Sequence, residues 1–301
     1  MQVFLTGATG FIGTALVRAL VDRGDRCTVV SRSDRNPWGD AGVLMVRADP
    51  AAPGAWQTEM AGAEVVVNLA GERIVDPPLR WTPERKARLT RSRVEVTRQV
   101  VAAIRAASPR PTLLVSGSAI GYYGSRGSEV LEESAAPGSD FLASLAQEWE
   151  RAALEAQDAV PVARVRTGIV LGVEGGALAP LLKLFRLGLG GPWGDGRQWW
   201  SWIHRHDAVA LLLFAIDGRL SGPVNLTAPN PVTVAQFAAA LGRALDRPAI
   251  IPAPTFALRI ALGEGADTLL ASQRVLPARA LELGFRFRFP ALETALADLL
   301  R

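Results

Sequence analysis

The sequence predicts an α/β protein built on a Rossmann-type doubly wound parallel sheet, with a smaller C-terminal α/β lobe. The chain opens with a short apolar run at residues 3–5, glycines at positions 7, 10 and 13, and an amphipathic segment at residues 11–19. Short apolar runs then alternate with longer amphipathic segments, as is typical of a parallel sheet covered by helices. With 301 residues, of which 49% are hydrophobic, the chain can bury a sizeable core.

The glycine turn after the first strand predicts a dinucleotide site. Glycine accepts positive φ and lets a ligand approach the backbone, while the free N–H groups of a helix start favour a phosphate. Because the glycines follow a strand and open a helix, a pyrophosphate site is favoured over a plain turn that needs small residues. The contacts expected here are Thr6, Gly7, Thr9, Gly10, Phe11, Ile12 and Gly13.

The end of the second strand, at residues 26–30, indicates which dinucleotide binds. An NAD site typically has Asp or Glu at the end of this strand to hold the ribose hydroxyls, and this chain has Ser31-Arg32-Ser33 there instead. Arg32, with the hydroxyls of Ser31 and Ser33, instead offers a charge-assisted cradle for a 2′-phosphate. We therefore expect NADP(H), the alternative being that Arg32 is merely solvated in a loop.

The next two strands supply the remaining cofactor contacts. A third strand at residues 44–46 leads to Asp49, whose carboxylate is expected to accept from the adenine amino group. A fourth strand at residues 65–69 runs into small residues that would let the chain pass close beneath the cofactor, although a plain turn is the competing interpretation. The contacts expected here are Asn68, Leu69, Ala70 and Gly71.

Further strands and helices complete the pattern. Strands are expected at residues 112–116, 162–171 and 224–226, and helices at 140–157 and 233–245. The strict alternation at residues 285–289 predicts a half-buried strand.

Four motifs narrow the assignment: SAIGYYG at 118–124, RTGIVLG at 166–172, GDGRQWWSWIH at 194–204 and NLTAP at 225–229. Through them, and over essentially its whole length, the chain resembles the atypical, extended short-chain dehydrogenase/reductases of the epimerase-like YfcH type. These are NAD-dependent epimerase/dehydratase-like proteins with a family-specific C-terminal tail. The resemblance implies that Ser118 polarises a substrate carbonyl and that Arg166 helps to shape the substrate pocket. A salt bridge to a helix acid is the alternative for Arg166.

The acid–base pair of typical members is missing. No Tyr-x-x-x-Lys sequence occurs, and Phe141 and Leu145 stand where the family would place it. Neither side chain can transfer a proton, so Tyr122 or Tyr123 with Ser118 is the expected catalytic set.

The tryptophan-rich segment before residue 207 suggests a substrate cleft. Trp202 could form part of an aromatic wall for a sugar or ring, with core packing as the alternative, and His204 is expected to pack or hydrogen-bond near the cleft. Asp207 is expected to cap the following helix. We expect no metal, because the protein has only 2 histidines and a closed zinc site needs more ligands.

Composition argues against several classes of function. The net charge is +4 and the pI about 9.9, but basic residues are scattered among acidic ones, so no nucleic-acid partner is expected. No apolar run of about 18 residues exists and Met1 leads straight into a strand, so we expect no membrane span, no signal peptide and a cytoplasmic location. Cys27 is the single cysteine and is expected to be buried rather than reactive.

Two functions follow from these observations. The first is an NADP-dependent, epimerase-like oxidoreductase that acts on a carbonyl, carbinol or nucleotide-sugar-like small molecule, as a monomer or homodimer. The second is a non-catalytic NADP-sensing protein, which the missing pair favours. Residues 1–172 with about 199–228 are expected to form the NADP-binding domain, and residues 173–198 with 229–301 the substrate-binding lobe.

Overall fold

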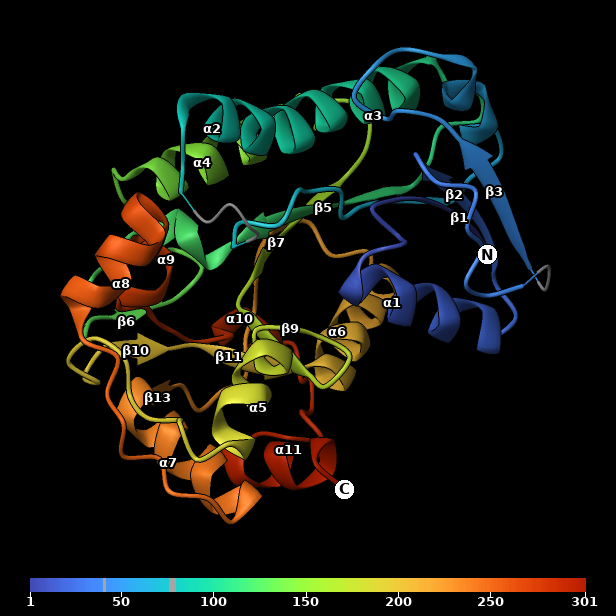
Figure 1. Ribbon diagram of the computed structural model, residues 1–301. Helices are drawn as coiled ribbons and strands as arrows, with labels where there is room; N and C mark the ends of the chain where they lie inside the picture. Colours follow the sequence, from blue (N-terminus) through green and yellow to red (C-terminus); the bar gives the residue numbers. More distant parts are fainter. Residues whose placement is uncertain (40–41, 76–79) are drawn as a thin grey trace.

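A parallel sheet of seven strands forms the centre of the computed structural model, which describes residues 1–39, 42–75 and 80–301 (Figure 1). The strands lie in the order β12-β7-β5-β4-β1-β2-β3, and every neighbouring pair is parallel. Their bounds are β1 (Gln2–Thr6), β2 (Arg26–Ser31), β3 (Val43–Arg47), β4 (Val65–Asn68), β5 (Leu113–Ala119), β7 (Val162–Thr167) and β12 (Gly222–Leu226). The order reverses between β1 and β4, which confirms the predicted Rossmann-type fold.

The strands form where apolar residues can be buried on both faces of the sheet. In β1, Val3 and Leu5 contribute to the core on one face, and Phe4 contributes to the core on the other. In β4, Val65 and Val67 alternate with Val66 in the same way. Continuous β-branched runs with no polar face are typical of strands buried between two helical layers.

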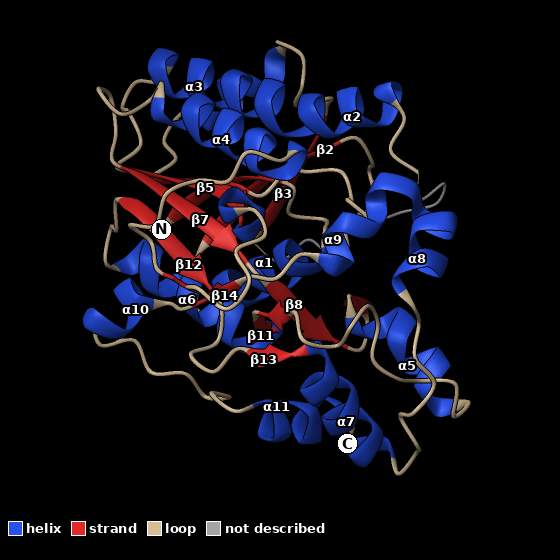
Figure 2. Cartoon of the chain, turned by 90° about the vertical axis from the view of Figure 1, so that its left-hand side faces the viewer, coloured by secondary structure: helices blue, strands red, loops and turns tan. Residues whose placement is uncertain are grey.

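Helices cover both faces of the sheet (Figure 2). One layer contains α1 (Phe11–Asp22) and α6 (Arg205–Asp217), and the other contains α2 (Pro83–Thr90), α3 (Val96–Ala106) and α4 (Phe141–Leu154). A single π-helical turn, Arg91–Glu95, joins α2 to α3. Such turns widen a helix locally and often occur at functional sites.

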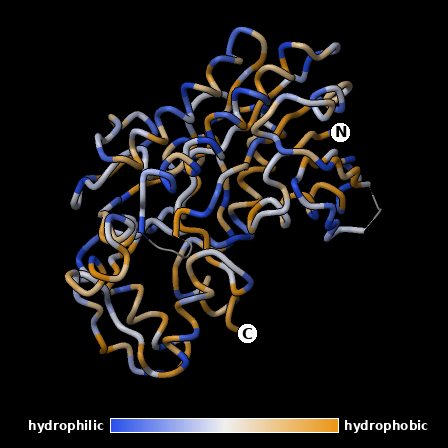
Figure 3. The backbone as a smooth tube through the Cα atoms, turned by 45° about the horizontal axis from the view of Figure 1, so that its top comes forward, coloured by the Kyte–Doolittle hydropathy of each residue, from blue (hydrophilic) through white to orange (hydrophobic). Residues whose placement is uncertain are grey.

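A second apolar core lies below the sheet in Figure 1, and hydrophobic stretches run through both regions in Figure 3. It is built by the helices α5 (Leu178–Arg186), α7 (Val234–Leu245) and α11 (Leu292–Leu299) and by two small sheets. These sheets pair β10 (Trp199–Trp200) with β13 (Val232–Thr233), and β8 (Ile169–Gly172) with both β9 (Gly175–Gly176) and β11 (Trp202–His204). The predicted domain boundaries stay a prediction.

Several short elements complete the fold. The strands β6 (Val130–Leu131) and β14 (Arg274–Val275) pair in parallel. The helices α8 (Thr255–Leu262), α9 (Asp267–Leu270) and α10 (Ala278–Glu282) follow one another in the C-terminal part, and 3₁₀ turns occur at Ala55–Met60, Ile120–Tyr123 and Gly263–Ala266. Within the described ranges, no helix is both long and apolar enough to cross a bilayer.

Two expected strands differ in the structure. The run at 162–171 is split at Gly168, where a Cβ would lie 2.7 Å from the carbonyl oxygen of Ser201, so that β7 and β8 belong to different sheets. Residues 285–289 form no strand. Phe285 and Phe287 pack beside the main sheet, whereas Phe289 packs in the second core. In a strand all three rings would lie on the same face, so they could not reach two different cores.

Candidate functional site

The glycine turn connects β1 to α1 and packs against the residues that follow β4. Gly7 has φ +72°, and a Cβ there would clash with the backbone of Leu69 and Ala70. A Cβ on Gly13 would lie 2.6 Å from the Cα of Ala8, so the first turn of α1 packs directly on the loop. Gly10 is the N-cap of α1 and provides no capping side chain. The helix start is therefore open to an anion, as a pyrophosphate site requires.

Side-chain hydrogen bonds fix the floor of this crevice. The Thr6 hydroxyl donates to Asn68 Oδ1 (2.7 Å), and the backbone N–H of Ala70 donates to the same oxygen (3.2 Å). Asn68 Nδ2 donates to Thr97 Oγ1 (2.8 Å). Thr6 and Asn68 are fully buried. The structure thus brings Thr6, Gly7 and residues 68–70 together, with the polar side chains facing inward and the backbone facing the crevice.

The loop after β2 is shaped by its own hydroxyl groups. Ser31 Oγ accepts from the N–H of Ser33 (3.1 Å), and Ser33 Oγ accepts from the N–H of Arg35 (3.1 Å). The nearby acid Asp34 pairs with Arg47 (2.9 Å), and Arg32 is exposed at the strand end. The loop is consequently preorganised with Arg32 at the surface beside the carboxyl edge of the sheet.

Asp49 lies at the end of β3, beside a cavity of about 270 Å³ that Trp56 also lines. Its carboxylate accepts from the N–H of Ala51 (3.1 Å) and from Arg91 Nη2 (3.0 Å). A further cavity, of about 580 Å³, is lined by Pro161 and Ser221, which precede β7 and β12. Ligands of open α/β sheets bind at the carboxyl ends of the strands, so we place the site at the crevice and not at that opposite edge.

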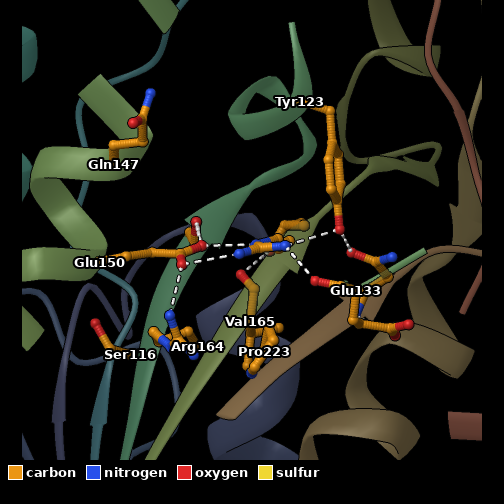
Figure 4. A network of polar contacts seen from close by, with 12 residues as sticks. Ser116, Tyr123, Glu133, Gln147, Glu150, Arg164, Val165 and Pro223 are labelled. Atoms are coloured by element: carbon orange, nitrogen blue, oxygen red, sulfur yellow. Dashed lines mark hydrogen bonds and ion pairs between the residues drawn. The ribbon is translucent and has the colours of Figure 1, made fainter. Parts of the chain in front are cut away.

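Figure 4 shows a network of polar contacts around Glu150. This network includes the buried residue Ser118. Its hydroxyl donates to Glu150 Oε1 (2.8 Å), which also accepts from Arg166 Nε (2.8 Å). Glu150 Oε2 accepts from Arg166 Nη2 (3.1 Å) and from Arg164 Nη1 (3.1 Å). Burial works against the charge of Arg166, but the hydrogen bonds and the charge of Glu150 outweigh it and raise the pKa of the guanidinium. The structure therefore contains the salt bridge to a helix acid that was the alternative for Arg166.

The two tyrosines have different environments. Tyr123 is fully buried; its hydroxyl donates to Asn225 Oδ1 (2.7 Å) and accepts from Arg166 Nη1 (3.0 Å). Burial raises the pKa of Tyr123. The ring of Tyr122 lies 3.5 Å from the Arg166 guanidinium and is partly exposed. Of Ser118, Tyr122 and Tyr123, only Tyr122 keeps its hydroxyl clear of hydrogen bonds to the described part of the chain.

Apolar side chains fill the place of the missing pair. Phe141 begins α4 after the N-cap Asp140, and its ring meets Trp81 edge-on at 5.5 Å. Lys86 Nζ lies 5.0 Å from the Phe141 ring centroid. Leu145 packs in a small apolar cluster with Leu89 and Val94. Neither position contributes a group that could exchange a proton.

Trp202 and His204 lie in the interior. Trp202 is fully buried in the second core, where its Nε1 donates to the carbonyl of Asn230 (3.1 Å), so it lines no open cleft and the core-packing alternative describes it. His204 stacks on Phe289 at 4.1 Å. Its Nδ1 accepts from the N–H of His206 (3.0 Å), and burial lowers its pKa.

Asp207 does not cap α6 as expected. His204 is the N-cap, and the Asp207 carboxylate accepts from the backbone N–H groups of Arg288 (3.0 Å) and Phe289 (2.8 Å). No cluster of three or more metal-ligating side chains occurs among residues 1–39, 42–75 and 80–301.

Sequence reasoning missed the burial of Glu150. Glu150 shares the buried face of α4 with Ala146 and Ala153, so helical spacing could have indicated that this acid is buried. Arg93 is buried beside Gly71, where a Cβ would lie 3.2 Å from its Cζ. Within the basic run of residues 85–93, both Arg85 and Arg93 are buried.

Comparison with known proteins gives two family matches. Residues 3–226 match the NAD dependent epimerase/dehydratase family, and residues 253–299 match a domain of unknown function, DUF1731. The chain is 42% identical to an epimerase family protein SDR39U1 homolog, chloroplastic, of Arabidopsis thaliana, over 100% of this chain and 87% of that protein. It is 36% identical to the epimerase family protein YfhF of Bacillus subtilis, over 100% of this chain and 98% of that protein.

Solved structures agree. The crystal structure of human epimerase family protein SDR39U1 (isoform2) with NADPH superimposes with a TM-score of 0.89 at 35% identity and covers 100% of this chain and 99% of the human one. A nucleoside-diphosphate sugar epimerase from Corynebacterium glutamicum gives a TM-score of 0.79 at 34% identity, with 100% of this chain and 58% of that chain covered.

Proposed function

The chain belongs to the NAD dependent epimerase/dehydratase family, and from this premise we propose that it is an NADP(H)-binding, epimerase-like oxidoreductase acting on a small carbonyl, carbinol or nucleotide-sugar-like compound. One observation carries the proposal: the glycine turn of residues 7–13 leaves the start of α1 without a capping side chain, and its Gly7 packs on the backbone of Leu69 and Ala70. The human relative solved with NADPH supports the same cofactor here. The narrower YfcH-type assignment stays a prediction.

Different residues of the chain would bind different parts of the cofactor. The N–H groups at the start of α1 would bind the pyrophosphate, and Arg32 with Ser31 and Ser33 would bind the 2′-phosphate that distinguishes NADP from NAD. Asp49 would lie beside the adenine, and residues 68–71 would pass beneath the ribose. When bound, the cofactor supplies or accepts a hydride at its nicotinamide ring.

Tyr122 is the residue proposed to exchange the proton that accompanies hydride transfer. Its hydroxyl is available, whereas those of Ser118 and Tyr123 are bonded to Glu150 and Asn225. The stacked Arg166 guanidinium, 3.5 Å from the ring, holds Tyr122 in place. In this proposal Ser118 is a positioning residue within the Glu150 network.

A specific observation favours a second candidate, a non-catalytic NADP-sensing protein. Phe141 and Leu145 replace the acid–base pair with apolar packing, and the Ser118 hydroxyl is directed at Glu150. A protein of this kind would bind NADPH with the same residues and release it unchanged.

Single-turnover oxidation of bound NADPH separates the two candidates. The protein, Tyr122→Phe and Ser118→Ala are each mixed with a panel of carbonyl compounds and nucleotide sugars, and NADPH absorbance is followed. We expect turnover with at least one compound, reduced by about a hundredfold in Tyr122→Phe, the range for loss of a general acid–base. Unchanged turnover in Tyr122→Phe removes that residue from the mechanism. NADPH binding without turnover of any compound supports the sensor.

Compartment and assembly stay predictions. A cytoplasmic location, a small-molecule substrate and a monomer or homodimer are expected from the sequence, while the Arabidopsis relative is described as chloroplastic. Fractionation of the native organism's cells and light scattering of the purified protein would test them.

A further inference from the structure

The π-helical turn between α2 and α3 buries an arginine under the crevice. Arg93 is only 9% exposed. Its Nη2 donates to the carbonyl of Glu72 (2.9 Å), and its Nη1 donates to the carbonyl of Leu89 (3.2 Å). Its guanidinium lies 5.2 Å from the Trp149 ring. Gly71 permits this arrangement, because a Cβ there would lie 3.2 Å from Arg93 Cζ.

The charge of Arg93 has no carboxylate partner within ion-pair distance among the residues that the structure describes. The nearest acid, Glu72, pairs with Arg85 and lies 3.5 Å from Arg88. Burial lowers the pKa of Arg93 to about 10, which still leaves it charged at neutral pH. Buried charges are normally paired, so a buried guanidinium bonded only to neutral oxygens calls for another explanation.

The guanidinium of Arg93 lies against Gly71. Its Nε–H donates to no acceptor in the described ranges, and Nε lies 3.5 Å from the place of a Cβ on Gly71. Gly71 follows the carboxyl end of β4, which lies between β1 and β5. The adenine half of a dinucleotide lies over β2 and β3, where the Arg32 loop and Asp49 are found, so the nicotinamide half extends toward β4 and β5. Arg93 therefore lies on the nicotinamide side of the glycine turn.

We propose that Arg93 provides a fixed positive charge at the nicotinamide end of the crevice and makes the site bind NADPH more tightly than NADP⁺. The nicotinamide ring is neutral in NADPH and positive in NADP⁺, so a nearby buried cation repels only the oxidised form. At a separation of about 10 Å and an effective dielectric constant of about 20, this repulsion corresponds to roughly a tenfold difference in affinity. Phe141 and Leu145 of α4 are apolar and add no compensating charge. The inference rests on the proposed cofactor binding.

Paired titrations test the inference. The dissociation constants of NADPH and of NADP⁺ are measured for the unaltered protein, Arg93→Met, Arg93→Lys and the control Arg98→Met. Arg98 is on α3, exposed and paired with Glu95 (2.6 Å). We expect the unaltered protein, Arg93→Lys and Arg98→Met to prefer NADPH by about tenfold, and Arg93→Met to bind the two forms about equally. A merely structural arginine would weaken both forms together and leave their ratio unchanged.

The unaltered protein alone can overturn the inference. The inference is refuted if the unaltered protein binds both forms with equal affinity or binds NADP⁺ more tightly, whatever the variants do. It is also refuted if folded Arg93→Met keeps the same ratio of NADPH affinity to NADP⁺ affinity. If circular dichroism shows that Arg93→Met does not fold, Arg93→Gln replaces it, because the amide removes the charge but keeps hydrogen-bonding groups, and the ratio should fall in the same way. If the protein binds neither NADPH nor NADP⁺, the proposed function fails together with the inference. If it binds both with equal affinity, only the inference fails.

Discussion

Arg166 of β7 and Glu150 of α4 form a two-pronged ion pair in the interior, with Nε to Oε1 at 2.8 Å and Nη2 to Oε2 at 3.1 Å. Their side chains are 3% and 4% exposed. The pair holds a helix to the sheet and continues through Tyr123 to Asn225 of β12. Stability at this position therefore depends on charge balance as well as on packing.

Glu150→Gln should destabilise the fold by about 3–5 kcal/mol, because it leaves the charge of Arg166 buried without a counter-ion and also removes the partner of the half-buried Arg164. Glu148→Gln is the matched control, since Glu148 lies on the exposed face of the same helix and should change stability by less than about 0.5 kcal/mol. Urea unfolding measures both. A loss below about 1 kcal/mol in Glu150→Gln would contradict the role assigned to the pair.

A comparison of Gly7→Ala with Gly24→Ala distinguishes the cost of backbone strain at positive φ from the cost of a steric clash. Both residues have positive φ, +72° and +90°, but a Cβ on Gly7 meets the backbone of Ala70, whereas one on Gly24 meets nothing within 4 Å. Gly24→Ala should cost about 1–2 kcal/mol and keep NADPH binding. Gly7→Ala should cost more and abolish binding, because β1 and β4 must move apart. Unfolding curves and NADPH titrations check both variants, and equal effects would argue against the close approach.

Arg32→Ala should weaken NADPH binding about 10- to 100-fold, the loss expected when one charge-assisted contact to the 2′-phosphate is removed. NADH affinity should stay the same, because NADH lacks that phosphate. Arg151→Ala, which removes an exposed arginine from α4, serves as the control and should leave both affinities as they are. Fluorescence titration measures them. An equal loss for NADH would show that Arg32 acts elsewhere.

Cys27 should be unreactive in the folded protein. It is 2% exposed, and burial raises the pKa of its thiol to about 12. Below that pH the thiol stays neutral in the folded state, whereas in the unfolded chain it ionises near its ordinary value of about 8.5. At pH 8 a disulfide reagent should therefore modify Cys27 only in urea, or at the rate of unfolding in buffer. Rapid modification of Cys27 in buffer without urea would contradict its buried position.

Much of the sheet could be predicted because its signals are local. Runs such as β4 (Val65–Asn68) are short, apolar and β-branched, and the glycine turn follows β1 at once. The split at Gly168 could not be found in this way. It depends on Ser201 and Thr227, which are distant in the sequence and leave no room for a side chain.

The site was predicted less completely, for a related reason. The family resemblance suggested chemistry for Ser118, but its partner Glu150 lies 32 residues further on and on another element. Trp202 was considered as part of an aromatic wall for a ligand, with core packing as the alternative, and it packs inside the second core. Residue type indicates what a side chain can do, whereas its neighbours decide what remains available to a ligand.

The position of β12 at the end of the sheet affects how the chain can fold during synthesis. Strands β1 to β5 leave the ribosome one after another and can pair at once, whereas β7 keeps an unpaired edge until residues 222–226 appear. Until then Tyr123 also lacks Asn225. An unpaired strand edge can pair with other chains, so the nascent protein exposes such an edge during this interval. A chain that ends near residue 172 would keep that edge permanently.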